Sequence, residues 1–231
     1  MKIYDLSISF DNFSLHIDDL DMPEGIIYGI IGPNGCGKTT AMKLMAGVMQ
    51  PDKGRIDYEG LTARDITMIF RKPYLLHDTV YRNLVYPLKL RKQQPDKDQI
   101  DHLLEIAGLG KLRDDYALNL SGGEQQKLSL IRALMFSPKL IFIDEGFSNM
   151  DIESVAFFED YILKMQRNDS GSEPPTSPAT WVIVSHQLSN IKRLCEHVLF
   201  MHDGKIKASG ATESVLSVPE DKDLKRYLQY S

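Results

Sequence analysis

Nine consecutive residues near the N-terminus have the composition of a phosphate-binding loop. They follow the apolar run Gly25 to Ile31 and precede Ala41 to Ala46, so the order is strand, loop, helix. Glycines let consecutive backbone N–H groups surround phosphate oxygens, and the new helix adds its positive end at the same place. The residues expected to contact a nucleotide are Gly32, Pro33, Asn34, Gly35, Cys36, Gly37, Lys38, Thr39 and Thr40.

Two side chains of this loop have specific expected roles. The spacing G-x-x-x-x-G-K-[ST] predicts that Lys38 reaches the β- and γ-phosphates, where it acts in catalysis. It also predicts that the Thr39 hydroxyl is a ligand of Mg²⁺. The sequence therefore predicts a nucleoside triphosphatase with a bound magnesium ion.

A second candidate site is a pair of carboxylates that follows the apolar run 139–143. Asp144 stands where such a core places its metal-directed acid, and it would hold Mg²⁺ directly or through water. Glu145 would polarise the attacking water as general base, because adjacent residues at a strand end point in different directions. Taken alone, the pair could equally be two solvated acids behind a core strand.

A third segment, residues 120–127, reads Leu-Ser-Gly-Gly-Glu-Gln-Gln-Lys and opens a polar helix. The Ser121 hydroxyl, the amides of Gly122 and Gly123 and the helix N-terminus form a second anion-binding site. A single chain has no use for two separated γ-phosphate sites. Two chains packed head to tail would have a use for them, because each chain would then close the other's site.

With this segment the chain resembles the nucleotide-binding subunits of ABC transporters. The resemblance implies ATP and Mg²⁺ as cofactors, and it implies that residues 121–123 bind the γ-phosphate of the nucleotide on the opposite subunit. Asp151, in Ser-Asn-Met-Asp over 148–151, resembles the acid that shapes the opposite site. His186, after the strand-like run 181–184, resembles the catalytic histidine that contacts the γ-phosphate, although a lone histidine is often structural. Phe10 resembles the aromatic that stacks on adenine, the alternative being a residue of the strand core.

The chain departs from this family at four places. Arg71 stands where the family has a glutamine after the strand 66–70, and its guanidinium could pair with a phosphate or with an acid on a partner. Gly146 stands where a proline often follows the glutamate. Glu124 replaces a glutamine in the first turn of a helix, where an acid is favoured. The Pro- and Ser-rich stretch 166–178 reads as an exposed, flexible insertion.

The expected fold class is α/β: a P-loop NTPase core of RecA-like type with an N-terminal antiparallel β subdomain and an inserted α-helical subdomain. Residues 3–22 suggest a hairpin around Asp11-Asn12, and strand-like runs recur in the core. Those runs are 26–31, 66–70, 140–143, 181–184 and 198–201. Helical patterns cover 79–90, broken by Pro87, then 97–107 and 122–135. The expected division is a core over 1–70 and 138–210, a helical subdomain over 71–137 and a C-terminal helical tail over 211–231, with an amphipathic helix after Glu220.

Composition limits the binding partners and the location that we expect for this protein. A net charge of −5 and a pI near 5.7 give no basic face for nucleic acid. No apolar run approaches the roughly 20 residues that cross a bilayer, so we expect a cytoplasmic protein that lies peripherally on the membrane. The two cysteines build no disulfide framework: we expect the Cys36 thiol to be accessible and Cys195 to be a small buried side chain.

The resemblance implies an ATPase subunit that powers separate membrane permease subunits and works indirectly with an extracytoplasmic solute-binding protein. It implies a second ATPase subunit, which would be another copy of this chain, and a groove around 74–80 for the permease. Residues 12–15 and 79–90 look like those of oxyanion importers of the tungstate and molybdate type. Two alternatives stay open: a soluble ABC ATPase without a transport role, and a nucleotide-dependent interaction module with little turnover, which Arg71 suggests.

Overall fold

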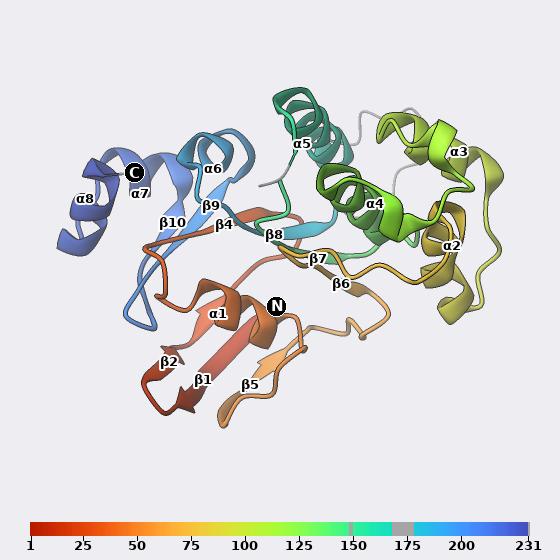
Figure 1. The fold of residues 1–231 in the computed structure, drawn as a ribbon. Coiled ribbons are helices and arrows are strands. Elements are labelled where there is room, and N and C mark those ends of the chain that lie inside the picture. The colour runs from red at the N-terminus through yellow and green to blue at the C-terminus, as the bar shows by residue number, and fades with distance from the viewer. Residues whose placement is uncertain (148–149, 168–177, 231) are drawn as a thin grey trace.

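The computed structural model describes residues 1–147, 150–167 and 178–230. The chain folds into one mixed sheet with helices on both of its faces (Figure 1). Ser148 and Asn149 of the 148–151 segment, and most of the 166–178 insertion, lie outside the described residues. The α/β class with parallel and antiparallel parts agrees with the expectation from sequence.

The parallel half of the sheet contains the five strands expected from the apolar runs. They are β4 (Ile27–Ile31), β6 (Ile66–Ile69), β7 (Leu140–Asp144), β8 (Thr180–Val184) and β9 (His197–His202). The order across the sheet is β9, β4, β8, β7, β6, and every neighbouring pair is parallel. Strands β4, β7 and β8 are buried throughout, which explains their continuous apolar sequences, because a strand covered on both faces needs no polar side.

The antiparallel half contains the predicted N-terminal hairpin and strands that the sequence did not predict. Its members are β1 (Lys2–Phe10), β2 (Phe13–Ile17), β3 (Leu20–Asp21), β5 (Lys53–Asp57) and β10 (Lys205–Ala211). Strands β1 and β2 pair around the turn at Asp11-Asn12, with Phe10 opposite Phe13. Strand β5 adds to the other edge of β1, and β10 joins β2 to β9.

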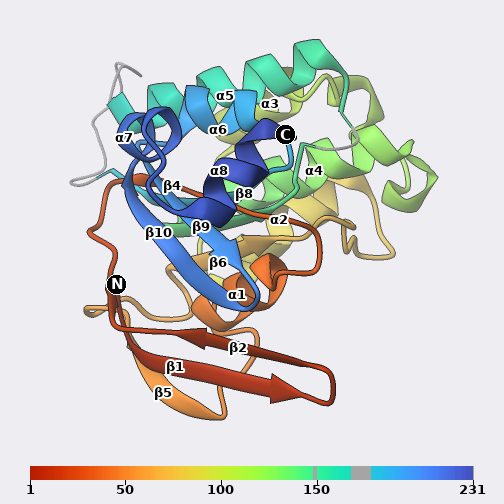
Figure 2. The same cartoon turned by 90° about the vertical axis from the view of Figure 1, so that its left-hand side faces the viewer.

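Helix α1 (Lys38–Met45) lies between the antiparallel strands and the parallel core (Figures 1 and 2). Its apolar residues pack in one hydrophobic cluster with side chains of β1, β2 and β7. Residues of β7 alternate between this cluster and a second one: Leu140 and Phe142 face α1, whereas Ile141 and Ile143 face the helices on the other side. The strand therefore holds α1, the helix that begins within the phosphate-binding loop, against one face of the sheet.

The stretch between β6 and β7 is helical, as predicted. It contains α2 (Val80–Arg91), α3 (Lys97–Ile106), the short helices η1 (Gly110–Leu112) and η2 (Ala117–Asn119), and α4 (Gly122–Leu134). The three longer helices begin with side-chain caps from Thr79, Asp96 and Ser121, which accept hydrogen bonds from the first free amides. Helix α4 packs on the core, while α2 and α3 lie farther out (Figure 1).

The expectation that Pro87 breaks the helical segment 79–90 is wrong. Helix α2 continues through Pro87 to Arg91. A proline inside a helix removes one hydrogen bond and crowds the preceding turn. Burial of Leu84, Val85 and Leu88 on both sides of the proline holds the helix against the subdomain core and offsets that loss.

The remaining helices cover the far face of the sheet and the C-terminal end. They are α5 (Ile152–Arg167), α6 (Leu188–Leu194), α7 (Thr212–Ser217) and α8 (Lys222–Gln229). Figure 2 shows α5 and α6 above the sheet, on the face opposite α1. Helix α8 confirms the amphipathic segment expected after Glu220, and its Leu224 is buried. None of the helices within the described residues is both long and apolar enough to cross a membrane.

Candidate functional site

The candidate residues gather at one edge of the parallel strands. The loop 32–39 follows β4, Asp144 and Glu145 end β7, and His186 comes two residues after β8. Arg71, the residue at the family's glutamine position, comes two residues after β6. Because parallel strands end at the same edge of a sheet, segments that are far apart in sequence meet here, as in other open α/β folds.

The backbone of the loop has no room for a side chain at Gly32. Its φ is 146°, and a Cβ there would lie 2.1 Å from the carbonyl oxygen of Met201 in β9. At Gly35 the φ of 78° is also positive, but a Cβ would meet nothing within 4 Å. The two glycines thus serve different purposes: Gly32 allows the loop to pass close to β9, and Gly35 leaves the centre of the loop open to a ligand.

Lys38 is folded back over its own loop. The side chain is buried, and its Nζ donates hydrogen bonds to the carbonyl oxygens of Gly32 at 2.7 Å and Pro33 at 2.9 Å. These contacts place the ammonium group at the mouth of the loop, next to the first turn of α1. The position fits its predicted role, because a cation there adds to the positive end of the helix.

Thr39 and Asp144 bring two oxygen atoms together. The Thr39 hydroxyl donates to Oδ1 of Asp144 at 3.2 Å. Asp144 is buried, and this burial raises the pKa of its carboxyl group above 3.8; the neighbouring Glu145 adds to the rise, while the hydrogen bond from Thr39 opposes it. A hydroxyl and a carboxylate are the hard oxygen ligands that Mg²⁺ prefers, so these residues fit the predicted metal.

Glu145 adopts a backbone conformation that is rare for a residue with a side chain. Its φ is 52°, in the left-handed region, and its N–H donates to the carbonyl oxygen of Val184 at 3.0 Å. Such a conformation costs about 1–3 kcal/mol and is concentrated at functional sites. In this conformation the Glu145 side chain reaches residues that follow β8 and β6.

The Glu145 carboxylate is paired on both of its oxygens. His186 Nε2 contacts Oε1, which brings together the two residues predicted to act on the attacking water. Arg71 Nε lies 3.0 Å from Oε2. From the sequence, the Arg71 guanidinium was expected to pair with a phosphate or with an acid on a partner. In the structure it pairs with an acid of its own chain. That pairing could not be anticipated from spacing, because it depends on β6 and β7 being neighbours in the sheet.

The Ser-Gly-Gly turn (residues 121–123) lies away from the phosphate-binding loop. Glu124 Oε2 accepts hydrogen bonds from the Ser121 hydroxyl at 2.7 Å and from its N–H at 2.8 Å. These bonds lower the pKa of Glu124. They form a capping box at the start of α4, so the predicted anion-binding donors of Ser121 contact an acid of the same helix. Within the described residues, the side-chain hydrogen bonds of Ser121 go to Glu124 and not to the loop 32–39.

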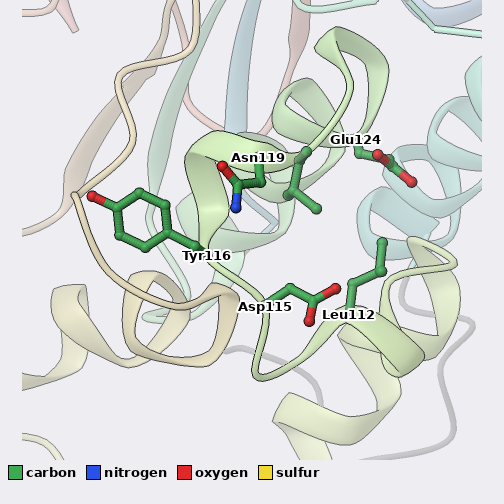
Figure 3. A pocket seen from close by; sticks show the side chains of 6 residues that line it. Leu112, Asp115, Tyr116, Asn119 and Glu124 are labelled. Atoms are coloured by element: carbon green, nitrogen blue, oxygen red, sulfur yellow. The ribbon is translucent and has the colours of Figure 1, made fainter.

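A surface pocket of about 340 Å³ adjoins this turn (Figure 3). Glu124 lines it from α4, and the other lining residues come from the segment that leads into the helix. Its members are Leu112, Asp115, Tyr116, Asn119, Leu120 and Glu124. The pocket therefore belongs to the surroundings of the Ser-Gly-Gly turn and contains none of the residues predicted in the loop 32–40.

Asp151 caps the first turn of α5. Its Oδ1 accepts from the N–H of Ser154 at 2.7 Å, and its Oδ2 accepts from the Ser154 hydroxyl at 2.7 Å. The hydrogen bonds from Ser154 lower the pKa of Asp151, and Lys127 of α4, 3.3 Å away, has the same effect. Asp151 thus links α4 to α5. The sequence did not predict the contact with Lys127.

Phe10 lies at the exposed end of β1, with 48% of its surface accessible. Its ring is stacked with that of Phe13 across the hairpin, with centroids 6.3 Å apart. Phe13 reaches the loop itself, because a Cβ on Gly37 would lie 2.6 Å from Phe13 Cζ. Sequence reasoning singled out Phe10 and missed Phe13, although the second aromatic lies three residues away on the facing strand.

The expectation of an accessible thiol in the loop is wrong. Cys36 is 4% exposed, and its carbonyl oxygen accepts from the N–H of Gly204 in the turn between β9 and β10 at 3.1 Å. Burial raises the pKa of the Cys36 thiol, against the opposite effect of Lys38. The loop is packed against a neighbouring turn on this side. Cys195 is buried, as expected, and burial raises the pKa of its thiol as well.

A phosphate-binding loop between strand and helix, with acids at the end of another parallel strand of the same sheet, defines a P-loop nucleoside triphosphatase. Residues 15–148 match the family model described as ABC transporter. The chain belongs to the ABC transporter family as one of its ATP-binding proteins, and these proteins are ATPases. The family resemblance seen in the sequence is confirmed.

Similar proteins of known function are also ATP-binding proteins of uptake and import systems. The chain is 36% identical over 200 residues to the tungstate uptake system ATP-binding protein TupC of Peptoclostridium acidaminophilum, an alignment that covers 83% of this chain and 89% of that protein. It is 29% identical over 228 residues to the Fe(3+) ions import ATP-binding protein FbpC of Photobacterium profundum. That alignment covers 94% of this chain but 63% of the iron-import protein, so this chain spans less than two thirds of that relative.

Solved structures support the fold. A structure of an ATP-binding subunit of an ABC transporter superposes with a TM-score of 0.80 at 22% identity, covering 99% of this chain and 98% of the other. The P-loop α/β architecture expected from the sequence is confirmed by this likeness.

Proposed function

We propose that this chain is the ATP-hydrolysing subunit of an importer that powers a separate membrane permease, and that the imported solute is a small oxyanion such as tungstate. Family membership supports the role in transport, and the similarity to a tungstate uptake protein supports the cargo. The observation that carries the enzymatic part is the meeting of Lys38, the Thr39–Asp144 pair and the Glu145–His186 pair at one edge of the sheet.

ATP would bind with its phosphates on the loop 32–40. The open space at Gly35 admits the phosphate chain, and Lys38 would exchange its contacts with the Gly32 and Pro33 carbonyls for the β- and γ-phosphates. Phe10, stacked on Phe13 and half exposed, would offer its ring to the adenine. The loop and the hairpin would then hold the two ends of one nucleotide.

Thr39 and Asp144 are the residues that would hold Mg²⁺. A magnesium ion at this position would neutralise charge on the β- and γ-phosphates. The Thr39 hydroxyl, which now donates to Asp144, would turn its lone pair to the metal, and Asp144 would bind in its ionised form. The ion would add positive charge beside the buried carboxylate, to that of Lys43 and Arg71, which already lower its pKa against the effect of burial.

Glu145 would act as general base and His186 as its partner. Glu145 accepts a proton from water as the water oxygen forms a bond to the γ-phosphorus, and the bond from that phosphorus to the β–γ bridging oxygen breaks, leaving ADP and phosphate. His186, in contact with Glu145 Oε1, would orient the carboxylate and hydrogen-bond the γ-phosphate. Lys38 stabilises the charge that develops on the transferred group.

The active form would be a head-to-tail dimer, with a second copy of this chain as the partner. Ser121, Gly122 and Gly123 would bind the γ-phosphate on the opposite subunit, and Asp151 would help to shape that site. The side-chain hydrogen bonds of Ser121, which go to Glu124 and not to the loop of its own chain among the described residues, support this arrangement. The start of α4 provides free amides and a positive helix end for the anion.

The helical stretch 71–137 would receive the permease. It carries exposed apolar side chains at Tyr74, Tyr86 and Leu90, which lie on the segment before α2 and on α2 itself. Such residues on a surface of this kind suit a contact with a cytoplasmic helix of a membrane protein. The chain would then lie on the cytoplasmic face of the membrane, and an extracytoplasmic solute-binding protein would act on it only through the permease.

Hydrolysis by the purified chain tests this proposal. We expect Mg-ATP hydrolysis per subunit to rise with protein concentration, because two chains complete each site, and to vanish in Glu145→Gln. Reconstitution with the permease should raise the rate when the binding protein carries tungstate. Hydrolysis that stays the same per subunit at all concentrations would contradict the dimer, and hydrolysis that survives in Glu145→Gln would contradict the role of Glu145.

A further inference from the structure

The proposed function gives no role to the ion pair between Arg71 and Glu145. Arg71 Nε lies 3.0 Å from Glu145 Oε2, while His186 Nε2 contacts Oε1. The carboxylate is 9% exposed, whereas the arginine side chain is 68% exposed. Oε2 has no hydrogen-bond partner among the described residues, so the arginine contact is an ion pair whose N–H does not point at the oxygen.

Arg71 belongs to a segment tied to the helical stretch. The carbonyl of the preceding Phe70 accepts a hydrogen bond at 3.5 Å from Gln126 of α4. Three residues after Arg71, the carbonyl of Tyr74 accepts from Arg132 of α4 at 2.6 Å. Glu145, in contrast, follows β7, a buried strand that pairs with β8 on one side and β6 on the other. The ion pair therefore connects the carboxylate to a segment that α4 contacts at Phe70 and at Tyr74.

We propose that Arg71 is a positioning residue that restrains Glu145, and that the step in which Glu145 leaves this ion pair limits ATP hydrolysis by the isolated chain. The proposal rests on the role of Glu145 as general base given above. The contact with Arg71 occupies Oε2, so this oxygen must leave the ion pair before it can approach the attacking water. It also holds Oε2 beside the segment that follows β6.

The exposure of Arg71 sets the size of the effect. An ion pair with one exposed partner contributes modestly, and the long side chain can move into solvent. We expect removal of the guanidinium to raise kcat by about two- to fivefold, which corresponds to about 0.4–1 kcal/mol at 1.36 kcal/mol per tenfold change in rate. The KM for ATP should not change, because Arg71 acts through Glu145 and not on the nucleotide.

The test compares Arg71→Gln, Arg71→Lys and Lys72→Gln in steady-state Mg-ATP hydrolysis. Lys72 is the matched control: it is the next residue, it is exposed, and it forms no ion pair with a described residue. We expect kcat to rise in Arg71→Gln, to return toward the wild-type value in Arg71→Lys and to stay unchanged in Lys72→Gln. A kcat that is unchanged or reduced in Arg71→Gln would overturn the proposal, and so would an equal rise in Lys72→Gln.

A double-mutant cycle gives a readout that does not depend on turnover. Arg71→Gln should lower the Tm of the nucleotide-free chain by about 1–3 °C, the shift that an exposed ion pair produces in a domain of this size. The same change should leave the Tm within about 0.5 °C when it is made in Glu145→Gln, where the pair is already lost. Equal shifts in both backgrounds would show that Arg71 does not act through Glu145.

Failure of the proposed function gives a different pattern. If the wild-type chain and Arg71→Gln both hydrolyse no more ATP than Glu145→Gln, the ATPase role is contradicted. The proposal that Arg71 restrains Glu145 is then contradicted as well. If the wild-type chain hydrolyses ATP and Arg71→Gln does so at the same rate, only the restraint is contradicted.

Discussion

The Thr39 hydroxyl donates a hydrogen bond to Asp144 Oδ1 at 3.2 Å, across a separation of 105 residues. This contact joins the first turn of α1 to the end of β7. Both residues are held by elements of the same hydrophobic cluster, so their side chains meet as a consequence of packing. The pair gives the site a fixed arrangement of a hydroxyl and a buried carboxylate.

Asp144→Asn should stabilise the nucleotide-free protein and abolish its activity. Burial raises the pKa of Asp144, so the folded chain holds the proton more tightly than the unfolded chain does. The free energy of unfolding therefore falls as pH rises from 3.8 to the raised pKa, and the charged side chain is destabilising above it. The neutral amide removes this cost, and each kcal/mol gained raises Tm by about 2–4 °C. Hydrolysis should fall on the order of 100-fold or more without the metal ligand.

Asp114→Asn is the control for that experiment. It makes the same change of charge at an exposed position. Neither the Tm nor the rate of hydrolysis should change by more than a small amount, since surface substitutions are usually within about 0.5 kcal/mol. A Tm of Asp144→Asn below that of the wild type across neutral pH would show that the carboxylate is stabilised by its surroundings, contrary to the effect of burial.

Gly32→Ala and Gly35→Ala should differ sharply in stability. Both positions have positive φ, which costs an alanine about 1–2 kcal/mol. Gly32 has the additional clash with the Met201 carbonyl, and a forced shift of packed backbone adds about 1–3 kcal/mol. Urea unfolding should show a loss of about 2–5 kcal/mol for Gly32→Ala against about 1–2 kcal/mol for Gly35→Ala. Equal losses would mean that β9 moves away from the loop at little cost.

The parallel strands and the loop could be predicted from sequence because their signals are local. A strand buried on both faces reads as a continuous apolar run, and a phosphate-binding loop needs glycines at fixed spacing. Strands β5 and β10 were missed because most or all of their residues are exposed or half-buried and show no apolar run. Their pairing is decided by the edges of β1 and β9, which local patterns do not encode.

The contacts of the site depend on strand order, which the sequence does not state. Arg71 meets Glu145 because β6 lies next to β7, and Glu145 meets His186 because β7 lies next to β8. The burial of Cys36 depends in the same way on the turn after β9. Residue types and spacing therefore predicted which side chains take part in the site, while the contacts between them had to come from the three-dimensional arrangement.

Cys36 should react slowly with thiol reagents. The side chain is buried, and burial raises the pKa of the thiol, so little thiolate forms near neutral pH and the reagent has poor access. In a Cys195→Ala background, labelling with N-ethylmaleimide at pH 7.5 should be at least about tenfold slower in the folded chain than in urea. Raising the pH should speed the reaction of the folded chain further into the alkaline range than that of the unfolded chain. Equal rates would show that the thiol is accessible in the folded chain.

Glu124→Gln should strengthen the ATP-dependent association of two chains. Glu124 Oε2 accepts the hydroxyl and amide hydrogen bonds of Ser121, so a γ-phosphate approaching that serine from the opposite subunit meets a negative charge. A glutamine oxygen can accept the same bonds and preserve the capping box while removing that charge. Exposed charge pairs are worth about 0.2–1 kcal/mol each, and two sites should lower the dissociation constant of the dimer by about two- to thirtyfold. Sedimentation of Glu145→Gln with Mg-ATP, with and without Glu124→Gln, measures this constant, and Glu105→Gln on the surface of α3 serves as the control. A weaker dimer in Glu124→Gln alone would mean that the acid assists binding at the Ser-Gly-Gly turn.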